Sequence, residues 1–406
     1  MEHSGTGRRV AALRKARGLT QLQLAERSNL SLSLVTKVET GHAPATPAFL
    51  GAVARALRVD VPRLLGQPYE PESGDVRQAR LLDTVPQVRK ALWELDYPDD
   101  EVPVRSVEEL TADVRKISEY GQQTNFIGIG TTLPTLLGEL SVAIASAGDD
   151  DRPRLYALLA EALSGASTIA GVLGLLDLRD RAYDRIETAS RACDDPIRVP
   201  RVQWQRAGAV LGVGAYSTGL KMMDRTRAEF GDDTAGRSAR ELSMLGSTYL
   251  RSAIVAARAA ATDGEPMVSV AWDSLDAAGE IARKIGADRN DYGLAFGPSN
   301  VAQHAVAVAV EMGDGAEAIR RDRETKLGVK VPPIRRSHHY IDVARAHLME
   351  GDRAGALEAL QRARRIAPQH VRHHPMVRET IYAIADGGRG SDDLTSFVSW
   401  LGLTAV

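Results

Sequence analysis

A short segment near the N-terminus carries side chains that suit the recognition of DNA base edges. The residues after Ser31 are expected to form a helix, with Val35 and Val38 facing inward because they lie three positions apart. The outer face then presents Leu32, Ser33, Thr36 and Lys37. Lysine donates to guanine O6 and N7, serine bonds several bases, and leucine packs against the thymine methyl group. Side chains of these types contact base edges when the helix that carries them lies in the DNA major groove.

Two short helices joined by a tight turn are needed to hold that face in place. Thr20 is a suitable N-cap for the first helix, and Gln23 three residues later completes a capping box. Asn29 interrupts the pattern, because asparagine tolerates the left-handed conformation of a tight turn. Ser31 then caps the second helix, which ends at Gly41. This is the geometry of a helix-turn-helix, whose second helix enters the DNA major groove.

Residues 8–66 resemble the helix-turn-helix domain of the phage-repressor, or Xre, family. The matching positions are Leu13, Arg14, Arg17, Gly18, Leu19, Thr20, Gln21, Leu24, Ala25, Val35, Val38, Glu39 and Gly41, followed by a closing pair of helices. The resemblance implies that Arg14 pairs with Glu39 and clamps the first helix to the third. It also implies that Gln21 bonds a backbone phosphate, which positions the protein without reading sequence. The DNA-binding residues that follow are Gln21, Ser31, Leu32, Ser33, Thr36 and Lys37.

Two alternatives stay open for this N-terminal part, residues 1–68, which we call the head. A bundle of four or five helices without DNA binding would have the same pattern, and some members of the family serve only as protein-contact modules. Leu32 and Leu34 depart from the more polar residues common in the recognition helix. The alternative to a base contact for Leu32 is packing against the preceding helix.

The rest of the head is helical in pattern and basic in charge. Thr46 and Pro47 begin a helix, residues 60–65 form a last short one, and residues 66–74 are a linker rich in proline, glycine and acid. Residues 1–66 hold ten Lys or Arg against four Asp or Glu, whereas the remainder holds 41 against 49. A basic head on an acidic body suits a module that meets phosphate.

The bulk composition is that of an ordinary globular protein. The chain has 406 residues, of which 44% are hydrophobic and 26% are charged. The single cysteine, Cys193, excludes an intrachain disulfide. No signal peptide is expected, and no apolar run approaches the roughly 20 residues needed to span a bilayer. We therefore expect a cytoplasmic protein without a membrane segment.

Beyond residue 76 nearly every segment has helical periodicity, and one set of spacings fits the 34-residue tetratricopeptide pattern. Its members are Tyr340, Val343, Ala344, His347, Gly351, Ala356, Leu360, Ala363 and Pro368. Weaker copies begin at Ile169, Leu245 and Val301, and residues 262–267 are expected to lengthen the turn of the copy at Leu245. We expect five to seven helical hairpins stacked into a superhelix with a concave face, closed by an end cap at 391–403.

Head and body together resemble actinobacterial Xre-type regulators with tetratricopeptide-like C-terminal domains. The stretches that carry this likeness are residues 133–137, 296–304, 341–346 and 373–379. At the level of architecture, the chain is also similar to the peptide-sensing regulators of Firmicutes, an analogy rather than a match of residues.

The stretch 296–304 is the candidate ligand site. Asn300 and His304 lie one helical turn apart, and an asparagine amide on a concave face can bind a peptide backbone or a small polar ligand. The other candidate ligand-binding residues are Phe296, Tyr249 and Arg206. The alternative is that Asn300 caps its helix and His304 lies between helices with its hydrogen bonds satisfied.

Five of the six histidines in the last quarter of the chain raise the question of a metal site. They are His338, His339, His370, His373 and His374. No cysteine accompanies them and their spacing matches no zinc template, so we predict no metal and no cofactor. The pairs Gly128-x-Gly130 and Gly212-x-Gly214 follow no predicted strand, and no nucleophile elbow, P-loop or zinc-protease motif is present. An enzyme is therefore not predicted.

The predicted fold is all-α: a phage-repressor-like helix-turn-helix bundle at 1–68, a linker at 69–80, and a tetratricopeptide-like α-solenoid at 81–406. The predicted function is that of a homodimeric transcriptional regulator, which binds a double-stranded DNA operator and senses a small molecule, peptide or protein through its repeats. The alternative is an interaction scaffold whose head docks a protein. Salt dependence separates them, because a DNA binder displaces counterions from phosphate.

Overall fold

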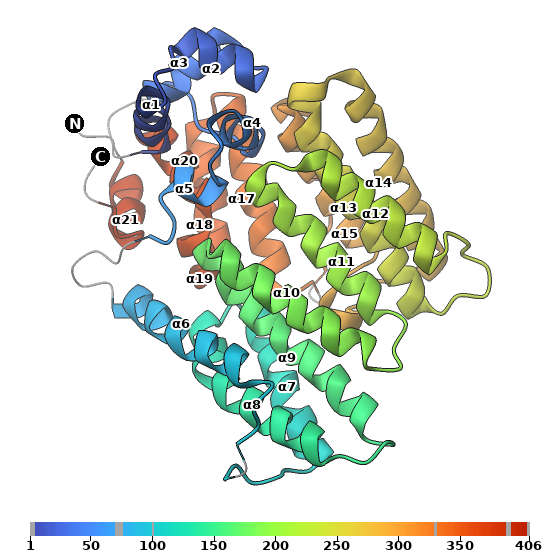
Figure 1. Cartoon of the computed structure of the whole chain (residues 1–406). Helices are drawn as coiled ribbons and strands as arrows, with labels where there is room; N and C mark the ends of the chain where they lie inside the picture. The colour runs from blue at the N-terminus through green and yellow to red at the C-terminus, as the bar shows by residue number, and fades with distance from the viewer. Residues whose placement is uncertain (1–4, 70–75, 100, 329–330, 387–390, 404–406) are drawn as a thin grey trace. The chain divides into compact units, whose positions relative to one another are not determined.

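The computed structural model describes residues 5–69, 76–99, 101–328, 331–386 and 391–403, apart from the side chains of 76–78 and 263 (Figure 1). Every regular element in these ranges is a helix, so the prediction of an all-α chain is confirmed. The chain forms two compact units. Unit 1 contains Met1–Tyr69 together with Ala207–Val406, and unit 2 is Glu70–Arg206. The domain expected at 81–406 therefore spans both units.

Five helices form the head at the start of unit 1. They are α1 (Thr6–Ala16), α2 (Gln21–Ser28), α3 (Leu32–Glu39), α4 (Pro47–Leu57) and α5 (Val61–Leu65). The predicted caps are present: the Thr20 side chain accepts from the Gln23 amide in a capping box, and the Ser31 side chain accepts from the Leu34 amide. Asn29 has a φ of 55° and ends α2 in the left-handed conformation, as its residue type indicated.

Buried apolar side chains from all five helices fill the head. The most deeply buried include Val10, Leu24, Val35, Phe49, Leu50, Val53, Leu57 and Leu64. Helices α1 and α3 also meet backbone to backbone, because a Cβ at Gly7 would lie only 2.0 Å from the carbonyl oxygen of Val38. The position of α3 is therefore fixed by a core beneath it and by α1 beside it.

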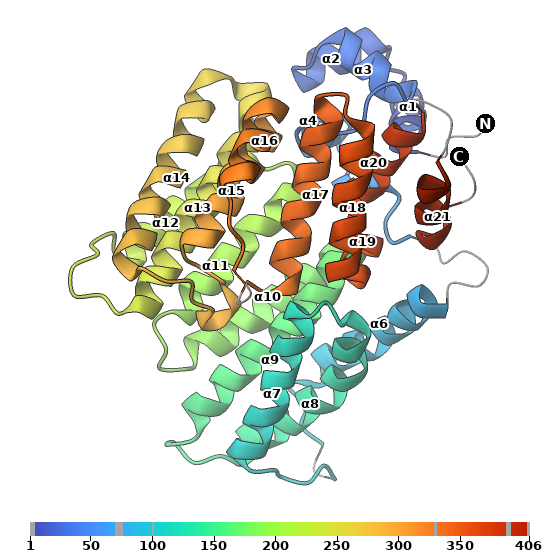
Figure 2. The ribbon, with the colours of Figure 1, turned by 180° about the vertical axis from the view of Figure 1, so that it is seen from behind.

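The remainder of unit 1 is a series of helices packed largely as neighbouring pairs (Figure 2). They are η1 (Val210–Val213), α12 (Tyr216–Phe230), α13 (Ala239–Asp263), α14 (Glu265–Ile285), η2 (Asp291–Gly293), α15 (Pro298–Met312), α16 (Gly315–Glu324), α17 (Pro333–Met349), α18 (Arg353–Ile366), α19 (Pro368–His373), α20 (Pro375–Ala385) and α21 (Asp392–Trp400). The predicted end cap corresponds to α21, where Leu394, Phe397 and Val398 are buried.

The hairpin of α17 and α18 coincides with the best of the predicted repeats. Ala344, Ala356 and Ala363 are fully buried where the helices pack, and Gly351 makes the turn with a φ of 77°. Small residues allow this close approach, while a positive φ favours glycine. The two helices and their turn are thus as expected, and their assignment to the tetratricopeptide class stays a prediction.

The turn between α13 and α14 differs from the expectation. Residues 262–267 were expected to lengthen it, but α13 ends at Asp263 and α14 starts at Glu265, so a single residue joins them. Gly264 has φ 72° and ψ −157°, a conformation almost confined to glycine. The expectation is wrong because one glycine reverses the chain where we allowed a loop.

Unit 2 consists of α6 (Val76–Glu94), α7 (Val107–Gln122), α8 (Phe126–Ser146), α9 (Arg152–Leu173), α10 (Leu176–Arg191) and most of α11 (Arg198–Ala209). The expectation that no segment reaches the length and apolarity of a membrane span is wrong for α8 and α9. About half of each apolar window is buried inside the structure, 50% in α8 and 56% in α9, as in the core helices of a packed domain.

Candidate nucleic-acid interface

The outer face of α3 is open to solvent in this structure. Its inner residues Val35 and Val38 are 0% and 2% exposed, whereas Leu32 is 44% exposed and the side chains of Ser33 and Lys37 are also exposed. Leu32 therefore does not lie buried against α2, which was the alternative to a base contact. The arrangement presents a hydroxyl, an ammonium and an apolar side chain together on one helical face.

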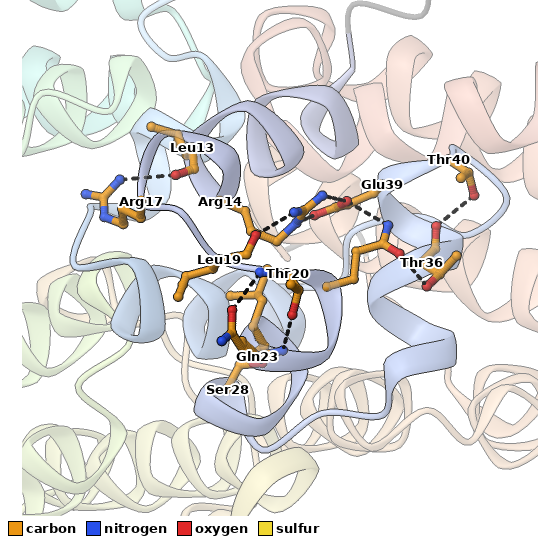
Figure 3. A network of polar contacts seen from close by, with 12 residues as sticks. Leu13, Arg14, Arg17, Leu19, Thr20, Gln23, Ser28, Thr36, Glu39 and Thr40 are labelled. Atoms are coloured by element: carbon orange, nitrogen blue, oxygen red, sulfur yellow. Dashed lines mark hydrogen bonds and ion pairs between the residues drawn. The ribbon is translucent and has the colours of Figure 1, made fainter.

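The clamp between α1 and α3 is a two-pronged ion pair (Figure 3). Arg14 Nε donates to Glu39 Oε1 and Arg14 Nη2 donates to Oε2, both at 2.7 Å. The third donor, Arg14 Nη1, reaches the carbonyl oxygen of Leu19 at 2.7 Å. The two side chains are 9% and 4% exposed, and the hydrogen bond to Glu39 raises the pKa of Arg14 above its usual value. The pairing implied by the family resemblance is confirmed.

Gln21 joins this network instead of projecting freely into solvent. Its Nε2 donates to Glu39 Oε2 at 2.9 Å, and its Oε1 accepts from Thr36 Oγ1 at 3.2 Å. The amide thus links α2 to two side chains in the C-terminal half of α3. A bond to DNA phosphate, the role expected for Gln21, stays a prediction, and it requires the amide to share or exchange these partners.

The other predicted DNA-binding residues differ in whether their polar atoms already have hydrogen-bond partners within the protein. Ser31 Oγ accepts from the Leu34 backbone amide at 3.2 Å, so this hydroxyl serves as the helix cap. Thr36 is half-buried and donates to Gln21. Ser33 and Lys37 are exposed on α3, one turn apart on the same face. The two best placed to reach base edges are therefore Ser33 and Lys37.

Most cations of the head lie on its surface. The exposed ones are Arg8, Lys15, Arg17, Arg27, Lys37, Arg55, Arg58 and Arg63. Glu39, by contrast, is neutralised by Arg14 within the bundle. The surface that the head offers to solvent is accordingly positive, the sign that attracts a phosphate backbone.

The head is joined to the rest of unit 1 through polar contacts that leave the outer face of α3 uncovered. Glu379 of α20 accepts from the Thr6 hydroxyl with one oxygen and from the Ala45 amide, at 3.4 Å, with the other. Elsewhere Arg55 donates to the Gly214 carbonyl at 2.7 Å. Both views place α2 and α3 at the outer edge of unit 1 (Figures 1 and 2).

A crevice of about 150 Å³ lies at this junction. Its lining includes Thr6, Arg8, Glu39, Glu379 and Tyr382. Drug-sized ligands occupy roughly 300–1,000 Å³. The crevice is therefore a gap between the start of α1, the end of α3 and α20, and it is too small for such a ligand.

The predicted ligand residues Asn300 and His304 lie on α15, with most of their surface buried. Asn300 is 4% exposed and does not cap the helix, because the N-cap is Gly297. His304 Nδ1 lies 2.9 Å from the Asn300 carbonyl oxygen, so this nitrogen carries the proton. Burial first, and then the charge of Arg335, lowers the pKa of His304 to about 3. This histidine is therefore neutral at physiological pH.

The other predicted ligand residues do not join them in one site. Phe296 is fully buried in the core, where it packs so closely on Gly246 that a Cβ there would meet its ring at 2.0 Å. Tyr249 lies beneath the Arg227 guanidinium, 4.4 Å from its ring centroid. Arg206 belongs to unit 2, where it pairs with Asp184 at 2.7 Å. Asn300 and His304 thus lie together, whereas the other three residues have separate structural environments.

Sequence reasoning considered the histidines of one cluster but predicted no metal site there. Side chains of His338, His370 and His374 meet in unit 1, with one candidate ligand nitrogen from each lying within 4.8 Å of the others. The i, i+4 spacing of His370 and His374 is the local signal for it. The third member lies 32 positions earlier in the sequence, so only the folding of α17 onto α19 brings it close.

One of the comparisons with known proteins falls entirely within the head. Residues 10–64, which include most of its five helices, match a family model described as Helix-turn-helix. The "Immunity repressor protein" of Bacillus phage phi105 is 29% identical over 127 residues, which cover 29% of this chain and 88% of that protein. A solved structure titled "Crystal structure of BtubC (BKLC) from P. vanneervenii" is 12% identical with a TM-score of 0.33, over 64% of this chain and 91% of the other, and we infer nothing from it.

Proposed function

We propose that this protein is a DNA-binding transcriptional regulator that recognises a double-stranded operator through α3. The observation that carries the proposal is the exposed face of Ser33 and Lys37 on a helix held by the Arg14–Glu39 pair. The helix-turn-helix match at residues 10–64 and the similarity to a phage immunity repressor support it. The positive surface of the head supplies the attraction to phosphate that such binding needs.

The finer parts of the proposal concern assembly and signalling. The regulator works as a homodimer in the cytoplasm, and its tetratricopeptide-like helices receive a small molecule, peptide or protein. Dimeric helix-turn-helix proteins place their recognition helices about 34–36 Å apart, so a pseudo-palindromic operator with half-sites about one helical turn apart is expected. Analytical ultracentrifugation of the protein with and without such a duplex tests the dimer.

The central experiment changes one cation on the reading face. Fragments selected from genomic DNA by binding to the protein first provide the operator. Lys37→Ala is then expected to weaken operator binding by ~1–3 kcal/mol and to relax sequence preference, because a donor to base edges is lost. Fluorescence anisotropy at fixed salt measures both. Arg63→Ala is the control, since it removes a charge that is also exposed but lies on α5, away from α3.

Gln21→Ala gives the contrasting result expected of a backbone contact. Operator and unrelated duplexes should lose affinity by similar factors, because a phosphate contact carries no sequence information. Unchanged operator affinity in the Lys37 variant would overturn the assignment of α3 as the reading helix.

The scaffold alternative makes the opposite prediction for salt. A DNA binder loses affinity steeply between about 50 and 200 mM salt as counterions are released from phosphate. A head that docks a protein would bind no duplex at moderate salt and would instead co-purify with its partner. The head contacts residues 207–406 through hydrogen bonds such as those of Glu379 and Arg55. Contacts of this kind also hold a docked protein partner, which is the observation that favours the alternative.

A further inference from the structure

Three histidines from three neighbouring segments meet on one side of α17. His338 lies in the second turn of α17, His370 lies on α19, and His374 sits between α19 and α20. Their ring centroids are 5.0 to 5.7 Å apart in all three pairs. The candidate ligand nitrogens lie within 4.8 Å of one another. Tetrahedral zinc sites with bonds of about 2.0–2.1 Å place such nitrogens about 3.3 Å apart. Each side chain therefore needs to move by only about an ångström to bring the three nitrogens to bonding distance from one ion.

The surroundings of two of the rings suit metal ligands. His370 Nδ1 lies 3.1 Å from Ser337 Oγ. With that nitrogen protonated and donating to the serine, Nε2 presents its lone pair, which is the usual way in which an outer partner orients a histidine ligand. His374 Nδ1 is buried and makes no hydrogen bond among the described residues. A bound cation would pair with this nitrogen, whose burial without a hydrogen bond is otherwise unfavourable.

The His338 side chain gives the cluster access to solvent. It is 50% exposed, so an ion has a path from solvent to the three nitrogens.

The charges near the cluster determine what completes the coordination. His338 Nε2 lies 3.7 Å from Asp342 Oδ2, and Asp342 in turn accepts from Arg345 at 3.0 Å. Glu311 accepts from the same Arg345 at 2.8 Å, so these groups partly balance one another. The Arg335 guanidinium, which lies near the histidines, has no hydrogen-bond or ion-pair partner among the described residues. An anionic ligand at a fourth position would offset this local excess of positive charge.

We propose that His338, His370 and His374 bind one divalent transition-metal ion of the zinc type, with a fourth position open to water or to an anionic ligand. Three neutral imidazoles select such ions over calcium or magnesium, which prefer oxygen ligands. Nothing in the DNA-binding proposal depends on this site, because its residues lie outside the head.

Cobalt(II) provides the direct test, because its visible absorption reports the coordination geometry. The full-length protein, purified without a histidine tag and treated with chelator, is titrated with Co²⁺ in the absence of DNA. One equivalent is expected to bind and to give the strong bands of a four-coordinate ion, and Zn²⁺ should displace it. His338→Ala is the principal variant, since this half-exposed side chain can be removed with little risk to folding.

The expected loss of affinity in His338→Ala is at least the ~10–100-fold that follows removal of an outer-shell partner. His347→Ala is the matched control, because His347 also lies on α17 but pairs with Asp352 at 2.9 Å, away from the cluster. The wild type failing to bind one equivalent would overturn the proposal. So would equal affinities in wild type and His338→Ala, or an equal loss in the control. Circular dichroism of each variant confirms that the chain remains folded.

Discussion

At the scale of single residues, Arg14 and Glu39 show how one buried ion pair positions a helix, α3. The pair ties α1 to α3, and Glu39 also receives the Gln21 amide from α2. Three helices therefore depend on one carboxylate. Removing one partner of a buried ion pair leaves an uncompensated charge, which costs more than the pair itself contributes.

Arg14→Ala is accordingly expected to destabilise the head by ~3–5 kcal/mol. Hydrogen exchange of backbone amides in residues 20–40 measures the change, because the head need not unfold together with the remainder of the chain. Arg17→Ala, on the exposed side of the same helix, should change protection by ~0.5 kcal/mol or less. Similar exchange in the two variants would contradict the proposed clamp.

His304 makes stability depend on acidity. The folded chain protonates this group only near its lowered pKa of about 3, whereas an unfolded chain takes up the proton near 6.5. Between these values the unfolded state binds more protons, so the contribution of His304 to stability is lost as the pH falls. The slope is on the order of 1.4 kcal/mol per pH unit for one such group.

Urea unfolding at several pH values from 7 to 4 checks this expectation. The free energy of unfolding should fall less steeply with acid in His304→Gln than in the wild type. His42→Gln, an exposed position in the head, serves as the control and should keep the wild-type slope. A wild-type slope in His304→Gln would rule out this histidine as the source.

At the scale of elements, the close approach of α1 and α3 depends on Gly7, which has no side chain. A methyl group at Gly7 would meet the Val38 carbonyl at 2.0 Å, and the obstacle is backbone that cannot rotate away. Gly7→Ala should therefore push the two helices apart and lower stability by ~1–3 kcal/mol. Operator affinity should fall with it, because α3 carries the reading face.

Thermal unfolding and anisotropy measure these two effects of Gly7→Ala. Gly138 on α8 offers the matched control, since a Cβ there meets nothing within 4 Å. Gly138→Ala should stabilise its helix by ~0.4–1 kcal/mol, because alanine has less freedom in the unfolded chain. A neutral Gly7→Ala would mean that the helices can separate without cost.

Local features of these elements were predictable from the sequence, but contacts between residues distant in sequence were not. The capping box of Thr20 and Gln23 depends only on residues three apart, so the pattern alone places it. The Arg14–Glu39 pair spans 25 positions, and only the family resemblance indicated it. The cluster at His338 and His370 needs two helices to fold together, and no spacing rule of linear sequence encodes that.

Errors in the prediction have equally physical causes. A single glycine at position 264 replaced an expected loop, because a left-handed residue reverses the chain within one step. The ligand residues at 296–304 were expected on a concave surface, but Phe296 is fully buried and Asn300 nearly so. Helical periodicity distinguishes the faces of one helix, but it does not reveal which face a later helix will cover.

At the scale of the whole molecule, the joint between the head and α20 contains a carboxylate away from water. Burial raises the pKa of Glu379, which bonds the Thr6 hydroxyl and the Ala45 amide. A raised pKa means that the folded state favours the protonated form. The contribution of this group to stability is therefore greatest in acid and is lost as the pH rises through its folded pKa.

Glu379→Gln tests that direction, because the amide keeps the shape and removes the charge. At pH 7 the variant should be at least as stable as the wild type, and the difference should shrink as the pH falls toward 5. Chemical unfolding of both proteins measures it, with Glu26→Gln on exposed α2 as the control. A difference that instead grows in acid would show that the ionised carboxylate stabilises the joint.

Helix α20 begins beside His374 and carries Glu379 five residues further on. One short helix therefore contacts both the imidazole cluster and the first turn of the head. If a metal ion and a DNA duplex each favour one position of α20, each ligand changes the affinity of the protein for the other by the same factor. The affinity for the metal ion would then differ by that factor between the DNA-bound protein and the free protein, although the two ligands do not touch.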